Sequence, residues 1–244
     1  MHKLNIIFDK FDTKIYSNFI KSALNKEFKF ISIYDIPKKK GKEIFLRHDV
    51  DLSPSLCLNT ALIESKFKIK SIYYFLINGE YYNVFNEENI KIIKKISKLG
   101  HYIGIHYSSK DTKSLKNKIL AFENIFELKI RSICPHDVSM NSFKKNKFIN
   151  EFIDPYDKFQ KYDFEYISDS GMKYRKYNFF DGIEKFSKIQ ILCHPEIWNS
   201  KKDNLFDVID ECKKIEINYI NKNFDNFKTH NLSYLKSRIS GKIK

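Results

Sequence analysis

Short apolar runs alternate with longer amphipathic segments along this chain of 244 residues. The short runs are bounded by turn residues and predict strands over 44–47, 70–77, 102–105, 130–134, 166–168 and 189–193. The longer segments repeat apolar residues at helical spacing and predict helices over 10–24, 54–66, 87–99, 112–127 and 204–221. Strands that alternate with helices are typical of βα units around a parallel sheet.

Local signals support the ends of two of these helices. Ser53 is a plausible N-cap with Pro54 at the first helical position, and Gly100 ends the segment 87–99. Six or seven such units favour a closed or nearly closed barrel over an open sheet, although the pattern alone does not force that choice. In either case, functional groups gather where parallel strands end and loops begin.

The composition indicates a folded α/β protein. Hydrophobic residues make up 42% and aromatic residues 16%, which is ample for a sizeable core. The net charge of +14 comes mainly from lysines spread along the chain. The densest run, Lys38 to Lys40, is interpreted as a solvated loop. No nucleic-acid-binding motif accompanies the charge, so we expect no nucleic-acid partner.

The cysteines and the apolar segments exclude several classes of protein. The four cysteines are scattered without a Cys-x-x-Cys pair, which argues against a zinc ribbon and a disulfide framework. The apolar stretch near Met1 is too short for a signal peptide, and no window is long enough to span a membrane. The sequence therefore predicts a cytoplasmic protein without an integral membrane segment.

Histidines gather at the predicted strand ends. Five of the seven lie there or in turns leading into strands: His48, His101, His106, His136 and His194. Each one alone is more often structural than a ligand. Their shared placement beside carboxylates points to a common site.

Asp49 and Asp51 lie two residues apart at the end of the first core strand, so their side chains are expected to point the same way. Two such carboxylates repel unless a cation neutralises them. A metal ion bound by one carboxylate would leave the other free to act as a general base. A capping or salt-bridged pair, with Arg47 as partner, explains the two residues equally well.

Five strings along the chain resemble motifs of the polysaccharide deacetylase family. They lie at 45–53, 99–107, 132–136, 167–171 and 192–195, in the family's order and at its spacing. The first contains Arg47-His48-Asp49-Val50-Asp51. It resembles the variant group with an Arg-His-Asp-Val-Asp motif that is found in surface-polysaccharide gene clusters for capsule or lipopolysaccharide.

The resemblance implies a fold, a domain organisation and an activity. The fold is a distorted (β/α) barrel of about seven parallel strands. It forms a single domain over 1–244, with a motif core at about 44–198 and an N-terminal helical extension over 1–43. The activity is metal-dependent removal of an acetyl group from an N-acetylated sugar, with a divalent metal ion such as zinc.

Carried over by position, the family's roles fall on four residues. Asp49 is the general base, Asp51 and His106 are metal ligands, and His194 is the general acid that protonates the departing amine. Asp169 orients a catalytic side chain or binds a sugar hydroxyl. A carboxylate beside His194 would raise the pKa of that imidazole.

One position departs from the family pattern. Lys110 stands where the family has a second metal-binding histidine, and a protonated lysine cannot be a ligand. His136, which follows the next strand, is the preferred substitute. His48 points away from Asp49 in a regular strand, so we assign it a supporting role, and we assign His101 a structural one.

Two further residues are candidates for substrate binding. Trp198 would stack on a sugar ring, with packing in the core or at the rim an equal alternative. Arg175 would bind an anionic group of the substrate, although an ordinary surface arginine is the simpler interpretation.

The sequence thus favours a carbohydrate N-deacetylase. Its expected substrate is an N-acyl amino sugar precursor of a surface polysaccharide, nucleotide-linked or lipid-linked. The alternative, suggested by Lys110, is a catalytically inactive barrel that binds a glycan or a protein partner.

Overall fold

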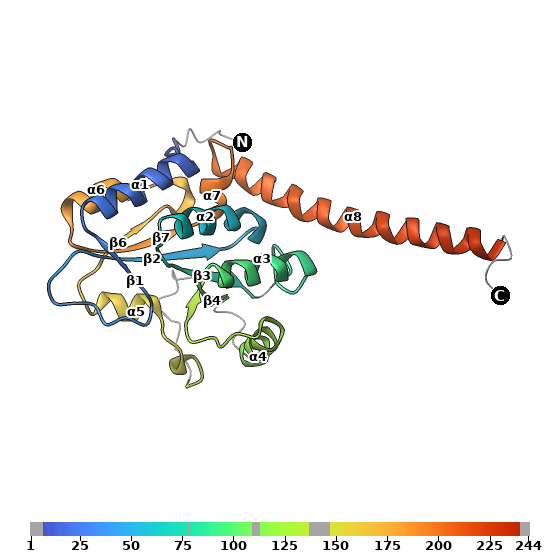
Figure 1. Cartoon of the computed structure of the whole chain (residues 1–244), viewed down its shortest axis with the longest axis horizontal. Coiled ribbons are helices and arrows are strands. Elements are labelled where there is room, and N and C mark those ends of the chain that lie inside the picture. The colour runs from blue at the N-terminus through green and yellow to red at the C-terminus, as the bar shows by residue number, and fades with distance from the viewer. Residues whose placement is uncertain (1–6, 78, 109–112, 137–146, 240–244) are drawn as a thin grey trace, which may run out of the picture.

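Seven parallel strands form one sheet in the computed structural model, which describes residues 7–77, 79–108, 113–136 and 147–239 (Figure 1). They are β1 (Lys29–Ile31), β2 (Glu43–Val50), β3 (Ile72–Leu76), β4 (Tyr102–Tyr107), β5 (Ile133–Pro135), β6 (Glu165–Ser168) and β7 (Lys188–Cys193). The order is β5-β4-β3-β2-β7-β6, with β1 also paired to β2. The prediction of an α/β protein on about seven parallel strands is confirmed.

Eight α-helices connect or flank the strands within the described residues. They are α1 (Thr13–Asn25), α2 (Pro54–Lys66), α3 (Glu87–Lys98), α4 (Leu115–Phe126), α5 (Pro155–Gln160), α6 (Phe179–Lys185), α7 (Pro195–Asn199) and α8 (Leu205–Ile239). Pro54 begins α2 as predicted, but Ser53 makes no side-chain capping bond. Asn86 caps α3 through its side chain, and Gly100, at φ 93°, follows the last turn of that helix.

Side chains of the sheet alternate between two faces, each with its own core. The outer face packs against α2, α3 and α4 on one side and against α1, α6 and α7 on the other. The inner face of the curled sheet holds Phe45, Tyr74 and Cys134, which pack with Phe159 of α5. The rings of Phe45 and Phe159 stack 4.0 Å apart. Because β5 and β6 are not paired with each other in the described part of the chain, the barrel is open there.

Gly104 of β4 allows close packing on the inner face. A Cβ at this position would lie 2.4 Å from the Tyr74 ring. The hydroxyl of Tyr74 reaches the Ser132 hydroxyl at 2.7 Å, which fixes the ring across the strand. A glycine is therefore required here for space rather than for backbone conformation.

The ends of the chain differ from the sequence prediction in two ways. The segment 1–43, expected to be helical, contains α1 but also β1, which pairs with the first residues of β2. The helix expected over 204–221 is α8 and continues to Ile239, so that it extends away from the body (Figure 1). Of the helices that the structure describes, none is long and apolar enough to cross a membrane.

Candidate metal centre

The carboxyl ends of the strands surround a cavity of about 350 Å³. Its wall is formed by Asp49, Asp51, His106, His136, Tyr156, Tyr166, Ser170, Arg175, Leu192 and His194. Parallel strands bring residues from distant parts of the chain to one edge, as expected for an α/β sheet. Six of the eight predicted site residues line this cavity; Asp169 lies directly behind His194, and Trp198 lies behind Asp169.

Asp51, His106 and His136 converge on one point of the cavity. A ligand atom from each lies within 4.8 Å of the other two. His106 Nε2 is 3.4 Å from Asp51 Oδ1, and His136 Nε2 is 3.5 Å from Asp51 Oδ2. The Cys134 carbonyl accepts a hydrogen bond from His106 Nδ1 at 2.8 Å, which fixes the tautomer and directs Nε2 at the carboxylates.

Asp51 is held in its charged form. Burial favours the neutral carboxyl, but His136, His106 and His194 outweigh burial and keep the pKa of Asp51 well below its usual range. Its Oδ1 atom is buried and has no hydrogen-bond partner among the described residues. A buried carboxylate oxygen needs a hydrogen-bond donor or a cation beside it. Because Asp51 Oδ1 has no donor among the described residues, it is suited to bind a metal ion.

Asp49 is paired with Arg47 of the same strand. Arg47 NH2 donates to Asp49 Oδ2 at 3.0 Å, and both side chains are buried. The guanidinium also lies 4.1 Å over the Tyr156 ring and donates to its hydroxyl. Burial opposes the charge of Arg47, yet Asp49 together with Cys134, Tyr156 and Tyr166 outweighs burial and raises the pKa of Arg47. The Asp49 pairing with Arg47, considered from the sequence, is thus present, and Asp49 still lines the cavity.

A second group of donors, Asp49, His106 and Cys134, is a poorer metal site. Arg47 contacts both Asp49 Oδ2 and Cys134 Sγ, the latter at 3.2 Å, so a cation would meet a fixed positive charge. Burial also raises the pKa of the Cys134 thiol well above its usual range, which disfavours the thiolate that binds metals. The group around Asp51 therefore fits a metal ion better.

His194 faces Asp51 from the other side of the cavity. Its Nε2 lies 3.6 Å from Asp51 Oδ2, and its Nδ1 donates to Asp169 Oδ1 at 2.6 Å. Burial lowers the pKa of His194, but Asp169 together with Asp51 and Asp49 outweighs burial and raises it to about 10. The imidazole is therefore protonated at neutral pH, which is the state of a general acid.

Trp198 is fully inside the protein rather than on the cavity wall. Its ring is 1% exposed and packs against Phe11, Tyr16 and Phe179, so no face of the indole is open to a sugar. Its Nε1 donates to Asp169 Oδ2 at 2.6 Å. Of the two interpretations considered for Trp198, packing fits this burial and stacking on a sugar does not. The indole also contacts the carboxylate that accepts from His194.

His48 and His101 belong to a separate polar cluster on the outer face. Its centre is Glu64 of α2, a buried carboxylate that the sequence did not single out. Glu64 contacts His48 Nε2 at 2.6 Å and accepts a bond from the Ser71 hydroxyl at 2.6 Å, while His101 Nε2 contacts the Ala61 carbonyl at 3.0 Å. The supporting role of His48 and the structural role of His101 agree with this placement.

Other residues of the site were not candidates from the sequence, although Ser170 lies in the string 167–171. Tyr156 and Tyr166 line the cavity from α5 and β6, and Ser170 follows β6. Glu196 accepts bonds from the backbone N–H groups of Leu52 and Ser53, which fixes the turn after Asp51. The contacts of Glu196 join segments more than 100 residues apart in the sequence. No local sequence pattern reveals such contacts. Lys110, which motivated the alternative of an inactive barrel, lies outside the described residues.

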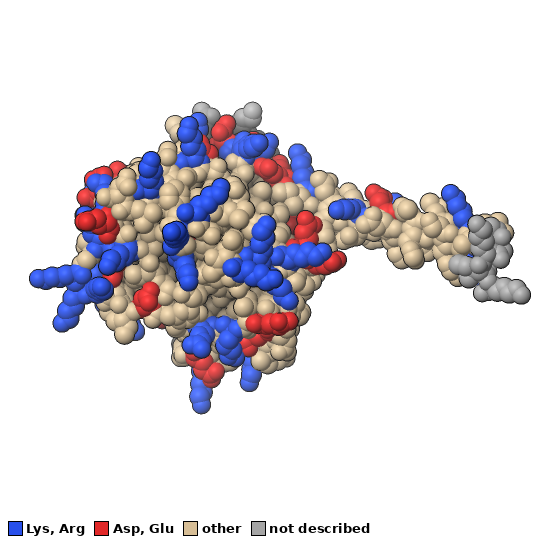
Figure 2. Space-filling model, viewed as in Figure 1, with Lys and Arg blue, Asp and Glu red and all other residues tan. Residues whose placement is uncertain are grey.

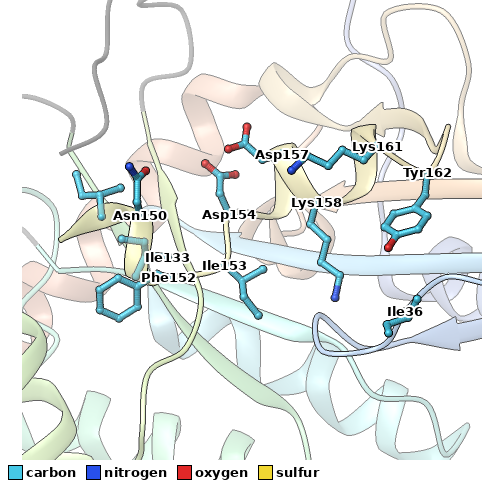
Figure 3. A pocket seen from close by; sticks show the side chains of 11 residues that line it. Ile36, Ile133, Asn150, Phe152, Ile153, Asp154, Asp157, Lys158, Lys161 and Tyr162 are labelled. Atoms are coloured by element: carbon cyan, nitrogen blue, oxygen red, sulfur yellow. The ribbon is translucent and has the colours of Figure 1, made fainter. Parts of the chain in front are cut away.

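A larger hollow of about 420 Å³ lies elsewhere, beside α5 (Figure 3). Its polar side chains include Asp154, Asp157 and Lys158. Asp154 caps α5 by accepting from the Tyr156 N–H, and Lys158 Nζ donates to the Ile33 carbonyl. No histidine or cysteine lines this hollow among the described residues, and it holds no arrangement comparable to the cavity around Asp51.

Solved structures with a similar fold include bacterial carbohydrate deacetylases. Peptidoglycan deacetylase PdaC from Bacillus subtilis is 15% identical, covers 82% of this chain and 99% of its own, and has a TM-score of 0.41. A family 4 carbohydrate esterase from Bacillus anthracis is 13% identical, with coverages of 91% and 94% and a TM-score of 0.42. A CE4 family pseudoenzyme from Bacillus anthracis is 15% identical, with coverages of 72% and 62% and a TM-score of 0.42. No protein-family model and no curated protein matches the sequence.

Proposed function

We propose that the protein is a metal-dependent carbohydrate N-deacetylase, which hydrolyses the amide of an N-acyl amino sugar. The observation that carries this proposal is the convergence of Asp51, His106 and His136 in a cavity that His194 and Asp49 also line. Three ligands, a base and an acid on one cavity wall are the groups that metal-assisted amide hydrolysis requires.

The donor set fits a divalent ion with zinc-like preferences. Two imidazole nitrogens and one carboxylate leave a fourth position open, as in catalytic zinc sites. The Cys134 carbonyl orients the His106 ring. The Oδ1 atom of Asp51, which has no hydrogen-bond partner among the described residues, lies beside His106 Nε2. When bound, the ion would polarise the acyl carbonyl and lower the pKa of a water molecule.

The chain's own residues would handle the protons. Asp49, anchored by Arg47 through Oδ2, would use its other oxygen to take a proton from the attacking water. His194, kept protonated by Asp169, would give its Nε2 proton to the departing amine. The two residues enter the cavity from β2 and from the end of β7, so that base and acid approach the scissile bond from different strands.

The substrate we propose is an N-acylated sugar or glycan precursor of a surface polysaccharide, made in the cytoplasm and nucleotide-linked or lipid-linked. Arg175 lines the cavity and would bind an anionic group of such a precursor. Tyr156, Tyr166 and Ser170 supply hydroxyls for hydrogen bonds to sugar.

Acetate release from a panel of N-acetyl amino sugars tests the proposal. We expect turnover by the zinc-loaded protein, loss of turnover after chelation, and recovery on adding zinc. Asp49→Asn should lower kcat by about 10² to 10⁴-fold while leaving metal binding intact. If zinc-loaded protein binds these sugars without releasing acetate, the proposal fails and the glycan-binding alternative holds.

A further inference from the structure

Helix α8 carries a largely exposed stripe of side chains, of which Phe206, near its start, packs edge-on against Phe8 with 6.4 Å between the ring centroids. Val208 and Cys212 bury one side of its first turns against the body, and toward its C-terminal end the helix extends away from the body (Figure 1). The stripe lies on a different side, with residues alternately three and four apart: Phe206, Asp210, Lys213, Ile217, Ile220, Phe224, Phe227, Asn231, Tyr234 and Arg238. This spacing is the seam of a coiled coil.

The free half of α8 needs a partner to be stable. Phe224 and Phe227 are 63% and 67% exposed, and uncharged surface covers much of the arm (Figure 2). The segment 219–239 contains four asparagines, which are poor helix formers. A solitary helix of this length and composition is marginal in water, and packing of an apolar face is what stabilises helices.

We propose that α8 pairs with α8 of a second copy of this chain in an antiparallel coiled coil centred near Lys222. At that centre, Ile220 packs against the partner's Phe224, and Ile217 packs against the partner's Phe227. By symmetry each contact occurs twice. The middle of the seam is therefore four aliphatic and four aromatic side chains with no polar group between them.

The outer layers are complementary in the same register. They place Lys213 against the partner's Asn231, Asp210 against the partner's Tyr234, and Phe206 against the partner's Arg238. These are a hydrogen-bonding pair, a carboxylate with a phenol, and a guanidinium with an aromatic ring. A parallel, in-register pairing would instead place Asp210, Lys213 and Arg238 against their own copies, which is unfavourable.

The charge along α8 also favours the antiparallel direction. Residues 205–218 carry four acidic and two basic side chains, whereas 219–239 carry one acidic and four basic. Antiparallel pairing sets the acidic half of one helix beside the basic half of the other. One flank is an exception, because Lys214 would face the partner's Lys228.

The body provides a groove along the same stripe. A hollow of about 340 Å³ beside the first half of α8 is lined by Leu52, Tyr81, Ile209, Ile217 and Ile220. The basic end of the partner's helix would lie in this groove. Ile209 also lines the adjoining hollow with Asp51 and His194, so the partner's arm ends beside the candidate metal centre.

The mass of the full chain in solution, measured by light scattering and by sedimentation over a concentration series, tests the pairing. We expect a dimer at micromolar concentration and a monomer for Phe224→Glu. Thr229→Glu, on the opposite side of the arm, should remain a dimer. Lys228→Glu should dimerise with an at least several-fold lower dissociation constant, because it replaces the repulsion between Lys228 and the partner's Lys214 with an attraction.

Distances between spin labels test the direction. The four native cysteines are buried, so a label can be placed at Ser233→Cys alone. Antiparallel pairing centred at Lys222 predicts a separation of about 33 Å, from 1.5 Å per residue. A wild-type monomer, a Phe224→Glu dimer, or a label distance below about 20 Å, as in parallel helices, would each overturn the proposal.

Discussion

Asp169 is the residue on which the proposed acid depends. It accepts hydrogen bonds from the Trp198 indole, from the His194 backbone N–H and from His194 Nδ1. Asp169→Asn removes the negative charge beside His194 and replaces one of the two acceptor oxygens with an NH2 donor, which disturbs the bond that selects the His194 tautomer. We expect kcat to fall by about 10² to 10⁴-fold with little change in KM. The alkaline limb of the pH–rate profile should move to lower pH.

Trp198→Phe is the matched control for Asp169. It retains most of the ring packing but removes one donor to the carboxylate, so the fall in kcat should be smaller than for Asp169→Asn. Equal losses in the two variants, or an unchanged alkaline limb in Asp169→Asn, would show that Asp169 acts only through packing.

Glu64 predicts how stability changes with acid. Burial would raise its pKa, but His48, His101 and Ser71 outweigh burial and lower it to about 2. A carboxyl with a depressed folded-state pKa stabilises the protein above its ordinary pKa, and this stabilisation is lost as the pH falls through the folded value. Wild type should therefore lose stability progressively from about pH 5 toward pH 2.

Glu64→Gln isolates that contribution. We expect its free energy of unfolding at pH 7 to fall by about 1–3 kcal/mol, because the buried hydroxyls of Tyr16, Ser71 and Tyr73 lose their charged acceptor. Its stability should depend less on pH than that of wild type below pH 5. Urea denaturation at several pH values measures both, and parallel pH profiles for the two proteins would contradict the assignment.

Among single residues, the sequence indicated those that line the cavity better than those that hold them in place. Asp51, His136 and His194 follow strands and His106 lies near the end of β4, and strand ends in a parallel sheet converge. Glu64, Tyr156 and Glu196 act through contacts with distant segments. Trp198 was open to two interpretations, because its burial depends on α1 and α6, which pack around it.

At the scale of elements, Gly104 decides how β4 packs on β3. Gly104→Ala ordinarily stabilises a strand by up to about 1 kcal/mol through the unfolded state. Here the added Cβ would lie 2.4 Å from the Tyr74 ring, and overpacking costs about 1–3 kcal/mol. The clash should win, with a net loss of stability measured by urea denaturation.

Gly182→Ala in α6 is the comparison for Gly104→Ala. Its Cβ would meet the Cδ1 methyl of Ile167 at 2.5 Å, which is the far end of a flexible side chain. Alanine is also favoured over glycine within a helix by about 1 kcal/mol. We expect Gly182→Ala to be close to neutral, and a larger loss than in Gly104→Ala would contradict this account.

Two elements, β1 and the second half of α8, were not predicted from the sequence, for physical reasons. The strand β1 is three residues long and gains its order from pairing with β2, so its own sequence carries little signal. The amphipathic pattern of α8 that faces the body ends near Tyr219, and the pattern beyond it lies on another side of the helix. A prediction based on one buried face therefore stops too early.

At the scale of the whole molecule, basic charge is spread rather than concentrated. Lysine and arginine side chains are scattered over the visible face and interspersed with acidic ones (Figure 2). The parallel sheet instead concentrates chemistry at one edge, where groups from β2, β4, β5, β6 and β7 or the turns after them meet. We propose that this edge binds a metal ion.

Titration of metal-free protein with zinc, followed by calorimetry, measures this binding. We predict one zinc ion per chain for wild type and at least about 10-fold weaker binding for His136→Ala. His230→Ala, which removes an exposed histidine of α8, should bind as wild type does. Wild-type protein that binds no stoichiometric zinc, or His136→Ala protein that binds it with unchanged affinity, would contradict the account.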